Sequence, residues 1–445
     1  MKLRQVPLLF FLLLFLASCT LLFPTHFFTN HIYNSTFLFC SYLKSKRIAS
    51  TTRSNLHLSN TSIWCDRTDH HSDICFMSGD VRTHSPSSSI SLYLPPSNPS
   101  NWVIKEERIR PYTRKWETPL MDTIDEIILR TASRNDSFHH KCDVTHDSPA
   151  LVFSAAGYTG NLFHSFNNVL LPLYITSQHL NQHVVLVVCG YRNWWYRKYE
   201  EILSQISEHP IVDFSNDTRT HCFPAAIVGL RFHGTLSVEP RRLHDRKSIM
   251  DFQNFLRKSY EPNNKRIEVY SKKKNHTPKL VIISRKGTRE IENERDVIQV
   301  SKKVGFDVEV LSPNETMPLK HIFDKLSKSD VVMGVHGAGL THFLFMRPGS
   351  MLIQIEPLGV ADEAWQCFGE PALKMGIRYI NYKVNLSESS LYKKYPISAM
   401  DTNAMESKKK GWKHTKEVYL EGQNVTLDLN RVKKVLTQAI GDLGF

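Results

Sequence analysis

Residues 330–356 constrain the fold of this 445-residue chain more than any other stretch, and they read D-V-V-M-G-V-H-G-A-G-L-T-H-F-L-F-M-R-P-G-S-M-L-I-Q-I-E. The apolar run 331–335 predicts a buried strand, 336–339 a turn, 340–346 a short helix and 351–356 a second strand. A strand, a helix and a strand in this order form one β-α-β unit. Such units build parallel sheets, so the stretch predicts an α/β fold.

The turn in this stretch is a candidate ligand site. Gly337 and Gly339 flank Ala338, and glycine lets a ligand approach the backbone closely where a strand gives way to a helix. The helix N-terminus also offers free N–H groups to a phosphate, so a diphosphate would fit there. The turn is neither a dinucleotide fingerprint nor a P-loop. On its own it therefore indicates tight packing as readily as a ligand site.

A basic loop is expected beside this turn. It reads S-R-K-G-T-R and contains Arg285, Lys286 and Arg289 directly after a predicted strand. Because parallel strands end at the same edge of a sheet, these side chains would lie beside His336, where guanidinium groups hold diphosphates well. Glu356 ends the next strand at that edge, and its carboxylate would accept ribose hydroxyls.

A second strand-turn-helix passage follows a strand predicted at 150–153. Asn161, His164 and Asn168 fall at i, i+3 and i+7 of its helix, so they are predicted to share one face near the N-terminus. Imidazole titrates near working pH and would serve as a general base for a hydroxyl group. A histidine packed on a half-buried helix is the alternative interpretation.

Strands and helices alternate along most of the remaining chain, which favours parallel sheets in two halves. The polar, Lys-rich stretch 261–279 is the predicted boundary between these halves. Further strands are expected at 184–189, 226–230, 280–284, 307–311 and 418–420, and helices at 120–132, from 194, at 248–257, 292–304, 318–327 and near the C-terminus.

The N-terminus predicts a membrane anchor. Lys2 and Arg4 precede the uncharged residues 6–23, and Pro24 closes this run. Its length suits a marginal membrane span, and the short basic flank should stay in the cytosol. The alternative is a cleaved signal peptide, because the small residues 17–19 would suit a peptidase.

The chain is thus predicted to have six segments. A Ser-, Thr- and Asn-rich stem follows the anchor and holds the folded part away from the membrane. The segments are a cytoplasmic tail at 1–5, a signal-anchor helix at 6–28, a luminal stem at 29–62, an N-terminal domain at 63–277, a C-terminal domain at 278–390 and a C-terminal extension with a closing helix at 391–445.

Sequons and cysteines agree with a luminal location. Seven cysteines lie beyond the apolar segment, and an odd number in an oxidising compartment implies a free or intermolecular thiol. Cys65 and Cys75 are close enough for a local bridge. Eight N-x-[ST] sequons are candidate glycosylation sites: Asn34, Asn60, Asn135, Asn216, Asn275, Asn314, Asn385 and Asn424.

Composition and charge exclude several classes of function. The formal net charge of +13 arises from scattered Lys and Arg without aromatic residues interleaved, so a nucleic-acid partner is not expected. The chain has neither C-x-x-C nor H-E-x-x-H, so a zinc site is not expected either. An acidic and His-rich cluster at 65–82 is more readily explained as a disulfide-closed loop than as a metal site.

Five passages together resemble the family-61 glycosyltransferases, specifically the plant xylan branch of Golgi enzymes that add arabinofuranosyl or xylosyl units. They cover nearly all of the chain after residue 63. The passages are C-x9-C with G-D-V-R at 79–82, G-Y-T-G-N-L-F-H-S-F-N-N at 157–168, I-S-R-K-G-T-R at 283–289, G-V-H-G-A-G-L-T-H at 334–342, and the tail 411–429.

The resemblance implies a type II membrane protein with a GT-B-like fold, in which two Rossmann-like domains face a cleft. Of these, 63–277 would be the acceptor-side domain and 278–390 the nucleotide-sugar-binding domain. It further implies inverting transfer from a nucleotide sugar without an essential metal or other cofactor. The chain also lacks the D-x-D motif that binds a metal and diphosphate in the other large glycosyltransferase fold. A UDP-pentose donor, a xylan or other glycan acceptor and the Golgi membrane are the expected partners.

The expected site has two parts. The catalytic residues would be His164, with Asn161 and Asn168 beside it. The residues expected to bind the donor are Arg285, Lys286, Arg289, His336, Gly337, Ala338, Gly339, Thr341 and Glu356.

The expected function is transfer of arabinofuranose or xylose to a xylan backbone. Alternatives are an N-glycan core β-1,2-xylosyltransferase, a catalytically inactive Golgi scaffold and a secreted carbohydrate-binding module. Members of the family tend to carry Asp where Asn168 stands and Asn where His342 stands. Asn168 is the feature that favours the scaffold.

Overall fold

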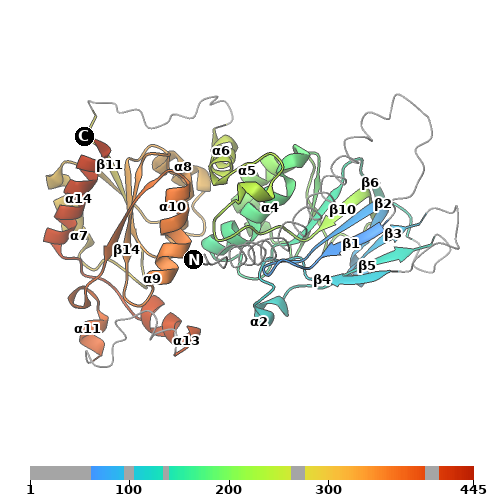
Figure 1. Ribbon diagram of the computed structural model, residues 1–445, viewed down its shortest axis with the longest axis horizontal. Helices are drawn as coiled ribbons and strands as arrows, with labels where there is room; N and C mark the ends of the chain where they lie inside the picture. The colour runs from blue at the N-terminus through green and yellow to red at the C-terminus, as the bar shows by residue number, and fades with distance from the viewer. Residues whose placement is uncertain (1–61, 95–104, 134–139, 262–275, 396–409) are drawn as a thin grey trace, which may run out of the picture. The chain divides into compact units, whose positions relative to one another are not determined.

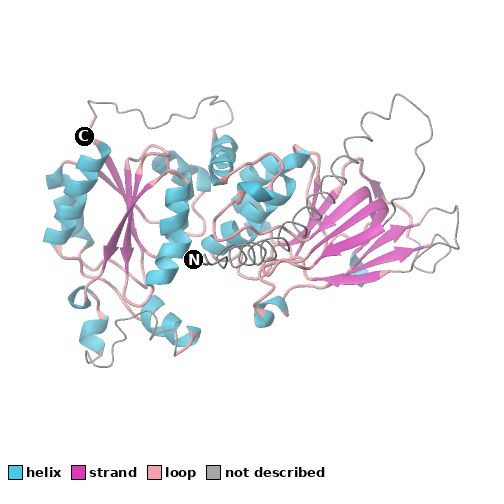
Figure 2. Cartoon of the chain, viewed as in Figure 1, coloured by secondary structure: helices cyan, strands magenta, loops and turns pink. Residues whose placement is uncertain are grey.

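The computed structural model describes residues 62–94, 105–133, 140–261, 276–395 and 410–445 (Figure 1). They form a mixed α/β fold with two sheets, one of ten strands and one of five (Figure 2). The predicted cytoplasmic tail and signal-anchor helix, and all but the last residue of the stem, lie outside these ranges. Within these ranges, every helix is too short or too polar to span a bilayer.

The five-stranded sheet is parallel throughout and has the order β12-β11-β13-β14-β15. The chain passes from β11 to β12 on one side and then returns to β13 on the other, so the strand order reverses at β11. Ligands of open α/β sheets bind at such a reversal, beyond the carboxyl ends of the strands. The strands are β11 (Lys279–Ile283), β12 (Asp307–Leu311), β13 (Val331–Val335), β14 (Met351–Glu356) and β15 (Arg378–Lys383).

Helices cover both faces of this sheet. Figure 1 shows α7 and α14 on one face and α8 and α10 on the other. The predicted strands and the helices at 292–304 and 318–327 are confirmed to within two residues, whereas the short helix after the glycine turn is a 3-10 helix, η6. The helices are α7 (Glu294–Val304), α8 (Leu319–Leu326), η6 (Ala338–Phe345), α9 (Ala361–Ala364), the π-helix η7 (Trp365–Gly369), α10 (Glu370–Lys374) and α14 (Leu429–Leu443).

The ten-stranded sheet is mixed. Its strands β10, β7, β8 and β9 are parallel neighbours, but β2 is antiparallel to β10, β1 and β3. The expected Rossmann-like pattern therefore describes only the second part of this half. The strands are β1 (Ser62–Asp66), β2 (Ile74–His84), β3 (Ser89–Tyr93), β4 (Glu106–Ile109), β5 (Ile127–Ala132), β6 (Val144–Thr145), β7 (Ala150–Ser154), β8 (Val185–Cys189), β9 (Val212–Asp213) and β10 (His221–Val228).

Two predicted elements are wrong. The helix expected at 120–132 is a short helix, α2 (Thr118–Met121), followed by β5, in which buried Ile127 and Leu129 alternate with less buried neighbours. This period of two is typical of a strand. The strand expected at 418–420 is instead part of a π-helix, η10 (Thr415–Leu420).

The helix of the second strand-turn-helix passage is continuous but changes its winding. It begins as α3 (Leu162–His164), widens into the π-helix η3 (Ser165–Leu170) and continues as α4 (Leu171–Ser177). Two longer helices of this half are α5 (Asn193–Ile206) and α6 (Ile249–Tyr260), close to where they were expected. Single-turn π segments inside helices occur frequently at functional sites.

Each sheet has its own core, yet both belong to one compact unit. Gln253 of α6 donates a hydrogen bond of 2.5 Å to the carbonyl oxygen of Met346. The rings of Phe166 and Tyr260 pack against Phe345, with centroids 6.2 and 5.6 Å away. The end of η6 is therefore held by helices of the first half.

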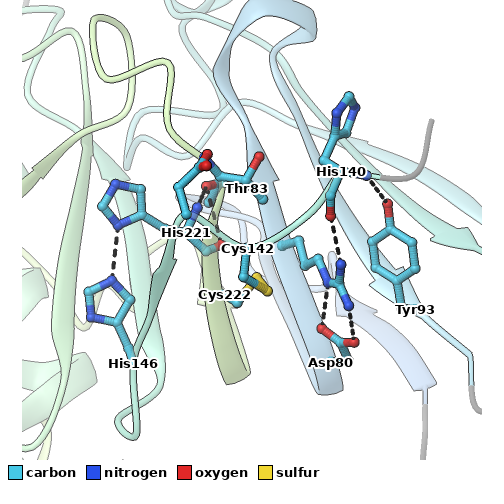
Figure 3. Close-up of a disulfide and its surroundings, with 11 residues drawn as sticks. Asp80, Thr83, Tyr93, His140, Cys142, His146, His221 and Cys222 are labelled. Carbon is cyan, nitrogen blue, oxygen red and sulfur yellow. Dashed lines mark hydrogen bonds and ion pairs between the residues drawn. A yellow bond between two sulfur atoms is a disulfide. The ribbon is translucent and has the colours of Figure 1, made fainter. Parts of the chain in front are cut away.

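Two disulfides lie in the first half. Cys65 and Cys75 are direct register partners on β1 and β2 and form one. The sequence analysis missed the other, which joins Cys142 to Cys222 on β10 (Figure 3). These residues are separated by 80 positions, so no local spacing indicates that they pair. Cys189 is a buried free thiol, and burial raises its pKa, so it is unsuited to act as a nucleophile.

Half of the candidate glycosylation sites fall within the described residues. Asn216, Asn314 and Asn385 are exposed. Asn424 is half-buried, and its Oδ1 accepts a hydrogen bond of 3.0 Å from the backbone N–H of Glu290. The other four sequons, Asn34, Asn60, Asn135 and Asn275, lie outside the described residues.

A buried carboxylate fastens the C-terminal extension to the second half. Glu388 is only 4% exposed. It accepts hydrogen bonds from the hydroxyl group of Tyr382, the guanidinium group of Arg431 and the backbone N–H groups of Asn385 and Asp428, the latter two at 2.8 Å. One side chain therefore joins the end of β15 to the start of α14.

Replacing Glu388 with Ala should destabilise the protein by about 3 kcal/mol, because it leaves one guanidinium group and two N–H groups without their acceptor. Thermal unfolding of the full chain measures this as a melting temperature several degrees lower. Glu309→Ala is the matched control, since Glu309 pairs with Lys325 at the surface and such pairs contribute about 1 kcal/mol or less. Equal melting temperatures for the two variants would contradict the assigned role of Glu388.

Candidate active site

The glycine turn after β13 holds two guanidinium groups against its backbone. Gly337 has a φ of +146°, in the region that favours glycine. A Cβ atom at this position would lie 2.6 Å from Nη1 of Arg285 and 3.1 Å from Nη1 of Arg289. Glycine is therefore required here both for the conformation of the turn and for the approach of the two arginines.

Both arginines are largely buried, and neither forms an ion pair with a carboxylate of the described residues. Arg285 donates through Nε to the carbonyl oxygen of Thr288 at 3.2 Å, and Arg289 through Nη1 to that of His336 at 3.0 Å. Burial lowers the pKa of Arg285. Burial and the charge of Arg285 together lower that of Arg289 to about 9. The charge of Glu421 opposes the shift of Arg289 without forming an ion pair. Two adjacent, largely buried cations without an ion-pair partner among the described residues favour an anion between them.

Only two of the three basic side chains of the loop reach the glycine turn. The side chain of Lys286 is exposed, whereas Arg285 and Arg289 both reach Gly337. Arg289 itself has a φ of +54°, which is uncommon for a residue with a side chain. Its backbone is therefore held by contacts from elsewhere in the chain.

Those contacts come from the C-terminal extension, which the sequence analysis did not connect with the site. The N–H of Arg289 donates to the carbonyl oxygen of Gln423 at 2.8 Å, and the N–H of Val425 donates to that of Glu290 at 2.8 Å. Gln423 is 1% exposed, and its own amide hydrogen-bonds to the backbone of Leu358. More than 130 residues separate the two segments, so no local motif could have indicated this contact.

His336 is a neutral hydrogen-bond donor. Its Nδ1 lies 3.0 Å from Nε2 of Gln354, whose Oε1 accepts from the hydroxyl group of Tyr379 at 2.9 Å. With the Gln354 amide assigned in this way, Nδ1 accepts and the proton of the ring lies on Nε2. Burial and the charges of Arg289 and Arg285 lower the pKa of His336 to about 3. The ring therefore adds a donor, but no charge, to the site.

The other residues predicted to bind the sugar donor lie on η6 and at the end of β14, close to the glycine turn. Ala338 and Gly339 open η6, and Thr341 follows one turn later, fully buried, with no hydrogen-bond partner for its Oγ1 in the described part of the chain. Glu356 ends β14, is 8% exposed and accepts from Nδ2 of Asn381 at 2.5 Å. Its carboxylate is held at the carboxyl edge of the sheet, where the fold predicts a ligand.

The second part of the candidate site is the pair His164 and Asn168. Nδ1 of His164 lies 2.8 Å from Oδ1 of Asn168, which is fully buried. With the Asn168 amide assigned in this way, its oxygen accepts, so Nδ1 carries the proton and Nε2 keeps a lone pair. Burial lowers the pKa of His164, and the hydrogen bond with Asn168 opposes this shift. The imidazole is therefore a neutral base with a fixed orientation.

Asn161 does not join this pair. It is exposed and forms the N-cap of α3, where its side chain accepts from the backbone N–H of Phe163 at 3.0 Å. The predicted common face thus holds only for His164 and Asn168. The cap still matters, because it fixes the start of the helix that carries the histidine.

An aromatic contact connects the two parts of the site. The ring of Phe368 on η7 lies 5.9 Å from that of Phe163 and 5.3 Å from the imidazole of His336. Phe163 directly precedes His164, and α3 packs against η6. The candidate base and the glycine turn therefore belong to one region of the protein.

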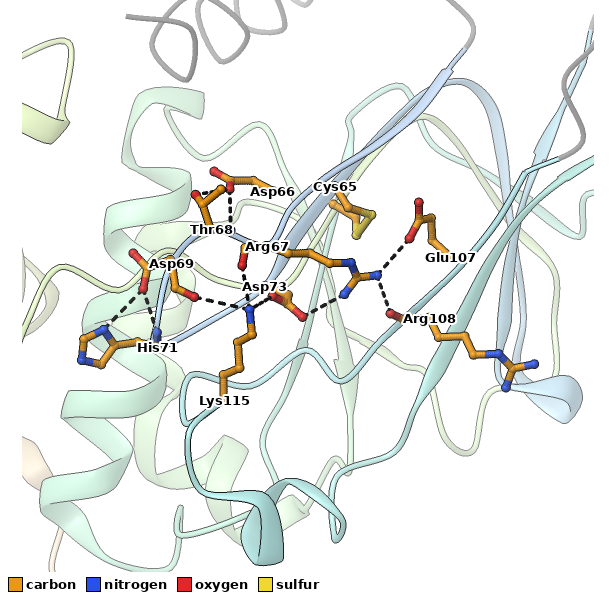
Figure 4. A network of polar contacts seen from close by, with 11 residues as sticks. Cys65, Asp66, Arg67, Thr68, Asp69, His71, Asp73, Glu107, Arg108 and Lys115 are labelled. Carbon is orange, nitrogen blue, oxygen red and sulfur yellow. Dashed lines mark hydrogen bonds and ion pairs between the residues drawn. A yellow bond between two sulfur atoms is a disulfide. The ribbon is translucent and has the colours of Figure 1, made fainter. Parts of the chain in front are cut away.

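The described residues contain no group of three or more His, Cys, Asp or Glu side chains that could hold a metal ion. In the acidic cluster of 65–82, the carboxylates of Asp69 and Asp73 are already engaged with cations, and Asp66 accepts hydrogen bonds from Thr68 (Figure 4). Asp73 pairs with Arg67 at 2.8 Å and with Lys115 at 2.7 Å, and Asp69 pairs with Arg242 at 2.7 Å. This cluster fastens loops of the first half to one another.

Comparison with known proteins bears out the resemblance found in the sequence. The model of the family described as Glycosyltransferase 61 matches residues 162–353, which include His164 and the glycine turn. The chain is 45% identical to the xylan glycosyltransferase MUCI21 of Arabidopsis thaliana, an alignment that covers 98% of this chain and 92% of the relative.

Two rice proteins are more distant relatives. The chain is 34% identical to the alpha-1,3-arabinosyltransferase XAT2 of Oryza sativa subsp. japonica, over 85% of this chain and 64% of the relative. It is 32% identical to the beta-1,2-xylosyltransferase XYXT1 of the same organism, over 84% of this chain and 83% of the relative. On the strength of the first alignment, which spans nearly the whole of both proteins, this chain belongs to glycosyltransferase family 61.

Proposed function

We propose that this protein is an inverting, metal-independent glycosyltransferase that moves arabinofuranose or xylose from a UDP-sugar to a xylan backbone in the Golgi. The names of its relatives support the sugars and the acceptor. The observation that carries the proposal is the pair of buried guanidinium groups of Arg285 and Arg289 on the backbone of Gly337. A diphosphate is the anion that a nucleotide sugar would bring to them.

The topology of the second half supports a donor site in a GT-B-like arrangement. Arg285 follows β11 and His336 follows β13, the two neighbouring strands at which the order of the parallel sheet reverses. Diphosphates of nucleotides bind at such positions in open α/β sheets. In this arrangement 278–390 binds the donor and 63–277 binds the acceptor.

The sugar donor would be held by charged groups and hydrogen-bond donors whose positions are already fixed. As the bond between the sugar and the diphosphate breaks, negative charge grows on the departing oxygen. Arg285, Arg289 and Nε2–H of His336 stabilise that charge without reorganising, because they are already positioned and partly shielded from water. Glu356 accepts hydrogen bonds from the ribose hydroxyls, and Thr341 adds an unpaired hydroxyl group.

His164 is the proposed general base. An acceptor hydroxyl oxygen attacks the anomeric carbon from the side opposite the diphosphate, so the configuration inverts. The new C–O bond forms while the bond to the diphosphate breaks, and the hydroxyl proton passes to Nε2 of His164. The hydrogen bond with Asn168 holds the ring proton on Nδ1 and orients Nε2, and burial keeps the ring neutral. Asn168 can therefore orient His164 as an aspartate at this position would, which favours an active enzyme over a scaffold.

The disulfides support a location in the secretory pathway. Two bridges in one folded unit form and persist in an oxidising compartment. The exposed sequons at Asn216, Asn314 and Asn385 agree with such a compartment. We therefore assign the described residues to the Golgi lumen, with 6–28 as the anchor.

Replacing His164 with Ala should reduce pentose transfer by a factor of about 10²–10⁴, the usual contribution of a general base. UDP binding should be unchanged, because the guanidinium groups are untouched. Transfer is measured with UDP-arabinofuranose and UDP-xylose on xylohexaose, and binding by calorimetry. The matched control is His321→Ala, which removes an exposed histidine of α8. Transfer by His164→Ala at the wild-type rate would reject His164 as the base.

Replacing Asn168 with Asp should shift the acid limb of the pH profile of kcat/KM to higher pH, by about one unit. A carboxylate next to Nδ1 stabilises the imidazolium ion and raises the pKa of His164, whereas burial lowers it in the wild type. Activity requires the neutral ring and is lost as the pH falls through the pKa of His164. The variant therefore loses activity at a higher pH than the wild type does. An unchanged acid limb would mean that His164 is not the group that titrates.

Replacing Arg289 with Gln should abolish the increase in melting temperature that UDP gives the wild type, because the anion loses half of its charged cradle. The ligand-free variant should melt no lower than the wild type, since the change also removes a largely buried charge that has no ion-pair partner among the described residues. Arg347→Gln is the contrasting variant, because Arg347 pairs with the buried Asp330 at 3.1 Å. It should melt lower yet keep the UDP response. A UDP response that is kept in Arg289→Gln and lost in Arg347→Gln would contradict binding of the diphosphate by Arg289.

A further inference from the structure

Two exposed aromatic rings flank Arg114, and one of them lies next to the proposed base. Trp116 is 40% exposed and Tyr158 is 39% exposed. The ring of Tyr158 lies 4.8 Å from the imidazole of His164. The guanidinium carbon of Arg114 lies 4.8 Å from the centroid of Trp116 and 5.4 Å from that of Tyr158. We call Arg114, Trp116 and Tyr158 the aromatic platform.

The platform is held in place by a carboxylate. Glu117 accepts a hydrogen bond of 2.6 Å from Nε of Arg114 and one of 2.6 Å from the hydroxyl group of Tyr158. The backbone N–H of Tyr158 also donates to the buried hydroxyl group of Tyr112 at 3.3 Å. The rings therefore have a fixed orientation before any ligand binds, which lowers the entropy cost of binding.

The platform continues away from His164. The ring of Trp116 lies 4.9 Å from that of His71 and 5.8 Å from that of His70, and His71 in turn stacks on Phe232 at 4.6 Å. His70 is exposed and His71 is partly exposed. A ligand that extends from His164 would thus meet several rings in succession.

The end of the platform at His164 leads to the second half of the protein. Phe163, which directly precedes His164, packs against Phe368 of η7 with ring centroids 5.9 Å apart. Phe368 in turn packs against His336 beside the glycine turn. The platform therefore borders the region in which the proposed transfer takes place.

The charges of the platform select against an anionic ligand. The single guanidinium group of Arg114 is paired with the carboxylate of Glu117 at 2.6 Å, so the platform has no free positive charge for a phosphate. What remains is aromatic surface bordered by hydrogen-bonding groups, and this combination suits a neutral ring with one apolar face and polar edges. A pyranose sugar has this character.

We propose that the aromatic platform binds the sugar rings of the acceptor chain that extend from the reacting hydroxyl group, so that the enzyme acts on a chain rather than on a single sugar. This inference rests on the proposed function, because it takes His164 as the position of the reacting hydroxyl. Trp116 is then a residue that determines specificity for acceptor length, at a distance from the bond that forms.

The test compares a long and a short acceptor, using the full chain in detergent. Trp116→Ala should lower the affinity for xylohexaose about tenfold, which corresponds to about 1.4 kcal/mol. It should raise the KM for xylohexaose to a similar extent and change the KM for xylobiose and the affinity for UDP much less. Trp116→Phe keeps an aromatic face and should retain most of the affinity, which separates loss of stacking from misfolding.

The matched control is Trp64→Ala. Trp64 of β1 is 38% exposed, and its ring stacks on that of Phe76 with centroids 5.4 Å apart. This variant should bind xylohexaose as the wild type does. Wild-type affinity and KM for xylohexaose in Trp116→Ala would overturn the platform while leaving the proposed function intact. A wild type that binds xylohexaose through Trp116 but transfers no pentose would support the platform and reject the proposed reaction. A wild type that neither binds nor transfers would reject both.

Discussion

The proposed donor site depends on the contact of two arginines with the backbone of one glycine. Arg285 and Arg289 approach Gly337 so closely that a methyl group there would collide with both. Like charges this near, with burial lowering the pKa of both, are unfavourable in the free protein. They persist because the surrounding structure holds each one separately, Arg285 at the end of β11 and Arg289 through the carbonyl oxygen of His336. The repulsion between the two guanidinium groups is therefore present in the free protein, and a bound anion would relieve it.

Two neutral histidines perform opposite tasks in the same region, and an amide side chain assigns each task. Gln354 donates to Nδ1 of His336, which leaves a proton on Nε2 for the diphosphate of the proposed donor. Asn168 accepts from Nδ1 of His164, which leaves a lone pair on Nε2 for the proton that the proposed mechanism transfers. Burial lowers the pKa of both rings, so neither needs a carboxylate partner to select its role. One ring gives a hydrogen bond and the other takes a proton.

The sequence predicted the second half well and the first half only in part, for physical reasons. Apolar runs such as 331–335 lie in a parallel sheet that is buried on both faces, so they are unmistakable. The stretch 127–132 lies in the mixed sheet, where alternating burial was taken for part of a helix. Arg285, Arg289 and His336 were placed together by strand order alone. The role of Gln423 and the bridge from Cys142 to Cys222 depend on distant contacts that no local pattern encodes.

The C-terminal extension is as much a part of the proposed donor site as the loop that it supports. Val425 and Leu427 are buried in the core of the second sheet together with Leu436 of α14. This burial fixes the backbone of the segment, and the carbonyl oxygen of Gln423 then fixes the N–H of Arg289. The loop alone could not hold Arg289 at a φ of +54°, because that conformation costs energy for any residue with a side chain. The position of the second guanidinium group is therefore determined by hydrophobic packing of the last part of the chain.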